Sequence, residues 1–104
     1  MKIYKVNNET KQFSTLALAK KYARENLKNK LKLFKLEDPT YPKDDKVYSF
    51  TKKQINEEPE DDLPEYNKSE KKLVGVLTFE SFNSFAISDL DVGDICYYIW
   101  EFKR

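Results

Sequence analysis

The chain has 104 residues, of which 39% are hydrophobic and 36% charged, with a formal net charge of +1. Its single cysteine excludes an internal disulfide, and the lack of histidine excludes thiolate–imidazole zinc sites and removes the commonest general base. No apolar run is long enough to cross a membrane and no signal peptide is visible, so we expect a cytoplasmic protein. The length suits one domain with a modest core, spanning residues 1–104.

The first part of the chain predicts a strand and then a helix. Residues 1–6 are typical of a short strand, and Asn7 favours the turn that follows. Residues 15–28 have the apolar spacing of an amphipathic helix, with Ser14 as its N-cap and Asn29 as its C-terminal stop. The apolar stripe of this helix consists of Leu16, Ala19, Ala23 and Leu27.

The rest of the chain predicts mainly strands. Residues 30–37 alternate lysine and leucine and then shift phase at Phe34, which indicates a strand with a bulge; continuation of the helix is the alternative. Residues 46–51 are rich in strand-forming side chains, and the most apolar strands are predicted at 73–82 and 95–102. The expected fold is therefore α+β: one domain with a mainly antiparallel sheet of about five strands and one N-terminal amphipathic helix packed on one face.

The last two predicted strands have no polar face, so both should lie centrally in a sheet that is covered on both sides. Strand alternation places Ile95, Tyr97 and Ile99 opposite Cys96, Tyr98, Trp100 and Phe102, and places Leu73, Leu77 and Phe79 opposite Val74, Val76 and Phe82. One helix covers one face only. The second cover is the middle of the chain, a curled half-barrel, or another polypeptide.

An acidic, proline-containing segment interrupts the predicted strands at about residues 54–71. Such a composition cannot bury enough apolar surface to order itself, so we expect a surface loop. Its carboxylates would steer the encounter with a basic groove, while an aromatic anchor would supply affinity. The candidate partner-binding residues are Glu57, Glu58, Glu60, Asp61, Asp62, Glu65 and Tyr66.

The composition contains no catalytic constellation. Cys96 lies in an apolar strand with no histidine to activate it, and Gly75 and Gly93 are too isolated for a phosphate-cradling loop. We therefore expect no enzyme activity, catalytic residue, metal site or cofactor. The leading hypothesis is a non-catalytic protein-binding module that docks its acidic surface and an aromatic patch onto a larger host protein, for which a nucleic-acid-binding enzyme is one candidate; charge mimicry of phosphates would then block the host's groove.

In composition, this short chain rich in Lys, Asn and Glu resembles small proteins of phages and mobile elements in low-GC bacteria. Many of those proteins inhibit host enzymes or defence nucleases. The resemblance implies an inhibitor or modulator.

Two alternatives remain open. Residues 1–56 contain fourteen Lys or Arg and six Asp or Glu, a net charge of +8, and residues 57–104 contain five and twelve, a net charge of −7. The first half would bind nucleic acid through its helix, with Tyr48 and Phe50 stacking on a single strand. The candidate nucleic-acid-binding residues are Lys20, Lys21, Arg24, Lys28 and Lys32. The other alternative is a small structural or assembly protein that self-associates, for example as a homodimer.

Overall fold

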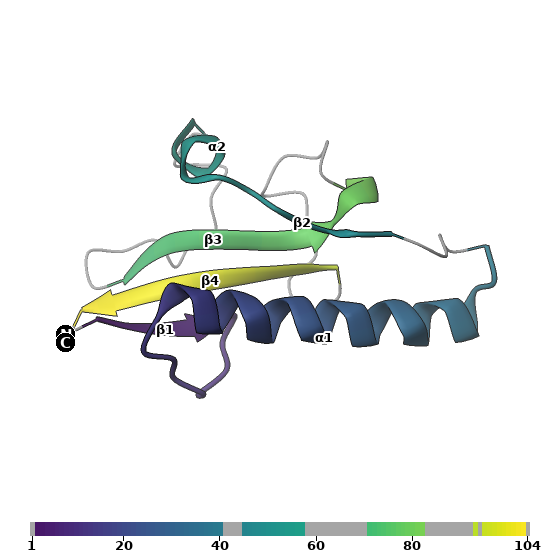
Figure 1. Ribbon diagram of the computed structural model, residues 1–104, viewed down its shortest axis with the longest axis horizontal. Helices are drawn as coiled ribbons and strands as arrows, with labels where there is room; N and C mark the ends of the chain where they lie inside the picture. The colour runs from purple at the N-terminus through teal and green to yellow at the C-terminus, as the bar shows by residue number, and fades with distance from the viewer. Residues whose placement is uncertain (1, 41–44, 58–70, 83–92, 94, 104) are drawn as a thin grey trace.

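The computed structural model describes residues 2–40, 45–57, 71–82, 93 and 95–103. The elements in chain order are β1 (Lys2–Val6), α1 (Leu16–Glu37), β2 (Val47–Ser49), α2 (Lys52–Glu57), β3 (Lys71–Phe79), a 3-10 turn (Glu80–Phe82) and β4 (Cys96–Lys103). The strands form one antiparallel sheet in the order β1-β4-β3-β2, and α1 lies along one face of it (Figure 1). The predicted α+β class is confirmed, but the described residues form four strands and not five.

The missing fifth strand is part of the helix. Residues 30–37 continue α1, so Asn29 does not end it. Leucine, lysine and glutamate favour helix, and no residue of this segment is β-branched. The buried row of the helix consists of Ala19, Ala23, Leu27 and Leu31. Continuing the helix therefore buries Leu31, and α1 ends only at Asp38, which precedes Pro39 and cannot easily remain helical.

Two turns and the start of α1 have the backbone features that local sequence signals concern. The predicted turn at Asn7 has a left-handed backbone with φ of 51°, and Gly93 has φ of 86°, the conformation that favours glycine. The Asn7 side-chain oxygen also accepts a hydrogen bond from the Tyr98 N–H at 2.8 Å, which ties this turn to β4. At the start of α1 the N-cap is Thr15 and not Ser14, because the Thr15 hydroxyl accepts from the Leu18 N–H at 3.2 Å.

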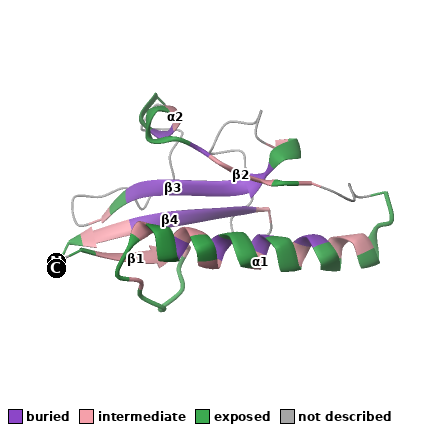
Figure 2. Cartoon of the chain, viewed as in Figure 1, coloured by how far each residue is buried: buried purple, intermediate pink, exposed green. Residues whose placement is uncertain are grey.

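The two central strands are buried on both faces. As predicted, β3 and β4 lie in the middle of the sheet, and the alternation along β4 is confirmed. Tyr97 and Ile99 pack in the cluster beneath α1, whereas Cys96, Tyr98 and Trp100 pack in the cluster on the opposite face. Phe50 and Ile55 of the same chain belong to that second cluster. Segments of this chain therefore help to cover both faces of the sheet, whose central strands are largely buried (Figure 2).

A β-bulge in β3 changes which side chains share a face. The pairing with β4 shifts between Leu73 and Gly75, so Val74 is an extra residue. Leu73 packs away from α1, while Val74 and Leu77 pack beneath it. Leu73 and Val74 have therefore exchanged faces relative to the prediction. At Gly75 the backbone approaches Ile99 so closely that a Cβ would lie 3.2 Å from its Cδ1 atom, which explains a glycine at this position.

Helix α2 occupies the start of the segment that we expected to be an acidic loop. The Thr51 hydroxyl accepts from the Gln54 N–H at 3.2 Å, and the Gln54 side-chain oxygen accepts from the Thr51 N–H at 2.8 Å. This reciprocal capping box begins the helix, and Ile55 anchors it with only 3% of its surface exposed. The prediction of a loop is wrong for residues 54–57 and for residue 71, which begins β3. Residues 58–70 lie outside the described part of the chain.

Candidate interaction surface

The cations proposed for nucleic-acid binding form a row along one flank of α1. Four of them directly follow the four buried residues, in the pairs Ala19–Lys20, Ala23–Arg24, Leu27–Lys28 and Leu31–Lys32. Because consecutive helical residues are rotated by about 100°, the cationic row runs parallel to the buried row, a quarter turn around the helix. Lys21 is exposed beside it. The structure thus brings together the residues that the sequence had singled out.

This helix carries a large excess of positive charge. Residues 16–37 include seven Lys or Arg and two Asp or Glu, which gives a net charge of +5. The four cations of the row, Lys20, Arg24, Lys28 and Lys32, take part in neither of the ion pairs Lys2–Glu101 and Lys53–Glu57 found among the described residues. Like charges four residues apart destabilise a helix by about 0.2–0.5 kcal/mol per pair, and the row contains successive pairs of this kind. A bound anionic surface would relieve this repulsion.

Not every lysine of α1 belongs to the cationic row. The Lys30 ammonium lies 5.3 Å from the centre of the Tyr97 ring on β4, within the range of a cation–π interaction. Lys30 therefore contributes to the packing between helix and sheet. This side chain is half-buried, in contrast to Arg24 and Lys28.

Exposed leucines are the second feature of α1. Among the described residues, the exposed large hydrophobic side chains are Leu18, Leu33 and Leu36, at 48%, 59% and 82% exposure, and all three lie on this helix. Leu33 and Leu36 are three residues apart and so are neighbours on the helix surface. They lie near its C-terminal end, which extends beyond the ends of β3 and β4 (Figure 1). Sequence reasoning missed this pair because it assigned residues 30–37 to a strand.

The acidic candidate residues are mostly outside the described part of the chain. Glu57 is the last residue of α2, is exposed, and has its Oε1 4.0 Å from the Lys53 Nζ. The structure describes no position for the others, which are Glu58, Glu60, Asp61, Asp62, Glu65 and Tyr66. Their role remains a prediction.

The aromatic side chains expected to bind a partner are largely interior. Tyr98 and Trp100 on β4 are each 2% exposed, so they do not form an exposed aromatic patch. Phe50 is 6% exposed, and its ring forms a T-shaped pair with the Tyr48 ring at a centroid distance of 5.3 Å. The expectation that a nucleic-acid base stacks on Phe50 is therefore wrong, because its ring is already covered.

The reactive thiol of the chain is not accessible. Cys96 is fully buried in the cluster on the face away from α1. Within the described ranges, no three His, Cys, Asp or Glu side chains are grouped closely enough to hold a metal ion. None of the helices described here combines the length and apolar composition needed to cross a membrane. No protein-family model, curated protein or solved structure matches the chain.

Proposed function

We propose that the protein is a non-catalytic protein-binding module, a small inhibitor or modulator that docks onto a larger host protein. The observation that supports this most directly is the exposed pair Leu33 and Leu36 at the projecting end of α1. Fully burying a leucine side chain stabilises a complex by about 1.5–3 kcal/mol relative to leaving it in water. Two adjacent leucines on a regular helix supply an apolar anchor whose conformation is already ordered before binding.

Charge supplies the second half of this proposal. The carboxylates of residues 57–66 would accelerate the encounter with a basic groove on the partner, and would imitate phosphates if that groove binds nucleic acid. Exposed ion pairs contribute little affinity each, so the leucine pair carries the binding energy and the acidic segment sets the partner and the rate.

The leucine pair provides a direct test. We expect the double variant Leu33→Gln, Leu36→Gln to lose its host partner in capture from lysate, with the partner identified by mass spectrometry. Glutamine is a good helix former, so α1 should remain intact. Leu18→Gln is the matched control, because Leu18 is exposed near the other end of the same helix. Equal capture by the double variant and the wild type would contradict the proposal.

Two further measurements make the result specific. Reversal of Glu60, Asp61 and Asp62 to lysine should slow association with the captured partner and remove most of its salt dependence. Sedimentation of the purified protein should show a concentration-independent monomer. A dimer that dissociates in the leucine variant would instead identify a second copy as the occupant of this surface and would overturn the proposal.

Nucleic-acid binding is a second candidate, favoured by the row of cations along α1. If this row contacts phosphates, each lost contact should reduce the slope of log affinity against log salt by about 0.9 for duplex DNA. We expect Arg24→Gln with Lys28→Gln to reduce the slope by about two such steps. Lys103→Gln, an exposed lysine at the end of β4, is the control. Failure of the wild type to bind single or double strands at low salt would eliminate this candidate.

A further inference from the structure

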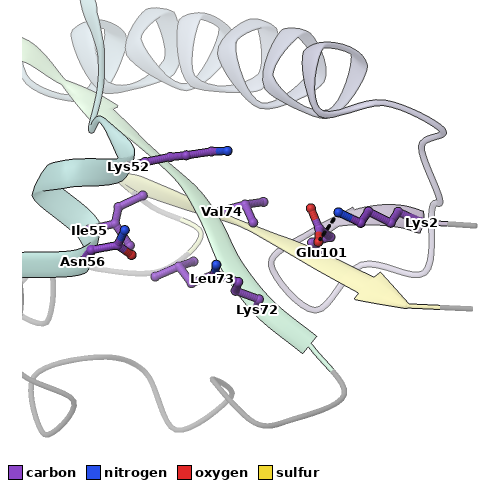
Figure 3. Close-up of a pocket in the computed structure, with 8 residues that line it drawn as sticks. All are labelled: Lys2, Lys52, Ile55, Asn56, Lys72, Leu73, Val74 and Glu101. Carbon is purple, nitrogen blue, oxygen red and sulfur yellow. Dashed lines mark ion pairs between the residues drawn. The ribbon is translucent and has the colours of Figure 1, made fainter.

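A pocket with a cationic rim lies between α2 and the sheet, at the bulge in β3 (Figure 3). Its empty volume is about 450 Å³, part of which is open solvent. Lysines from three different elements line it: Lys2 from β1, Lys52 from α2 and Lys72 from β3. Asn56 and Glu101 complete the polar lining. Bulges often occur beside functional sites, where they redirect side chains and end strand pairing.

The fold brings these groups together by strand register. Glu101 on β4 is paired with Tyr4 on one side and with Lys72 on the other. The pairing of β2 with β3 ends at Leu77, and the Phe50 N–H donates a hydrogen bond to the Val76 carbonyl. Helix α2 packs against β3 beyond that point. The side chain of Lys52 then reaches from α2 across β3 (Figure 3).

The carboxylate in this pocket is already neutralised from within the protein. Lys2 Nζ lies 3.4 Å from Glu101 Oε1, and the Glu101 side chain is only 16% exposed. Burial raises the pKa of the Tyr4 hydroxyl, and its hydrogen bond to Glu101 raises that pKa further. Although Lys72 is directly opposite Glu101, the two charged groups form no ion pair within the described residues.

Two of the three lysines that line the pocket are not paired with Glu101. With three lysines and one glutamate, the lining has a net charge of +2, and Lys52 and Lys72 have no carboxylate partner among the described residues. The lining also includes three apolar side chains that are themselves buried, since Ile55 and Leu73 are each 3% exposed and Val74 is 8% exposed. The side chains of Lys52, Asn56 and Lys72 are exposed. An anion can therefore reach both ammonium groups from solvent.

We propose that this pocket binds a phosphoryl group, as inorganic phosphate or as a phosphate monoester. A dianion matches the charge of the lining. Its oxygens would accept hydrogen bonds from the ammonium groups of Lys52 and Lys72 and from the side-chain amide of Asn56. A carboxylate carries half that charge and fewer acceptor oxygens, so it should bind less tightly. This site shares no residue with the leucine pair or the cationic row of α1.

The test is a titration followed by backbone amide NMR at constant ionic strength, with inorganic phosphate, adenosine monophosphate and acetate as separate ligands. We expect phosphate to shift signals around residues 52–56, 72–74 and 101, and acetate to bind at least several-fold more weakly. Tighter binding of adenosine monophosphate than of phosphate would identify a nucleotide as the source of the phosphoryl group; equal binding would show that the phosphoryl group alone is recognised.

One variant should weaken phosphate binding and another should strengthen it. Lys52→Gln with Lys72→Gln should weaken phosphate binding about tenfold or more, because two charge-assisted contacts are lost. Lys53→Gln is the matched control, since its side chain is 84% exposed, lies outside the pocket and approaches Glu57. Glu101→Gln should tighten binding several-fold, because it removes the negative charge and releases Lys2. Shifts scattered over all lysines, equal weakening by Lys53→Gln, or weaker binding by a folded Glu101→Gln variant would each overturn the proposal.

Discussion

Replacement of Trp100 by alanine is expected to lower the free energy of unfolding by about 3–5 kcal/mol. The side chain is 2% exposed and packs with Phe50, Ile55 and Tyr98 on the face of the sheet away from α1. The Lys71 ammonium also lies 5.3 Å from the centre of its ring, so the variant loses a cation–π contact as well as apolar burial.

The measurement is urea denaturation followed by circular dichroism, because Trp100 is the only tryptophan and its fluorescence disappears in the variant. Trp100→Phe is the control, and it should cost clearly less because it keeps most of the apolar volume. A loss below about 1 kcal/mol for the alanine variant would mean that this face of the sheet is not a packed core.

The second large effect is expected at Leu27. Leu27→Ala should destabilise the protein by about 2–5 kcal/mol, because this fully buried side chain lies in the cluster between α1 and the sheet. Leu33→Ala makes the same chemical change six residues later in the same helix, where the side chain is 59% exposed. That control should change stability by no more than about 0.5 kcal/mol.

The comparison of Leu27 with Leu33 tests which side of α1 packs against the sheet. A cost at Leu33 equal to that at Leu27 would show that residues 30–37 are packed as a buried element, and the surface assigned to partner binding would not exist. Small domains are stable by only about 5–15 kcal/mol, so either core variant removes a large part of the total.

The central strands were predictable because their composition constrains them strongly. From Cys96 to Trp100, β4 has largely apolar side chains on both of its faces. Such a strand can lie only where both faces of the sheet are covered. The strand predicted at residues 30–37 was wrong because it followed the alternation of lysine and leucine, although the same residues favour helix and extend an existing helical stripe. Burial of Leu31 against the sheet decides between the two, and that contact is tertiary.

Two other features left weaker signals. The Thr51–Gln54 spacing is a capping box and is a signal for α2. The carboxylates and prolines that follow it are typical of a loop, and the loop prediction followed from them. The bulge at Val74 has no such signature, since both residues beside it are apolar or glycine and suit either face. The pocket depends on that bulge and on the pairing of Glu101 with Lys72, so no local sequence pattern indicates it.

The pairing of β1 with β4 has a consequence for how the protein folds. The register joins Lys2 to Lys103, so the contact spans almost the whole chain. During translation, a nascent chain cannot complete this sheet until β4 has left the ribosome, because β4 lies between β1 and β3. Contacts of such long range slow folding, because the entropy of closing the loop is lost before the contacts form. Pairing of β1 with β4 should therefore be a late step in folding.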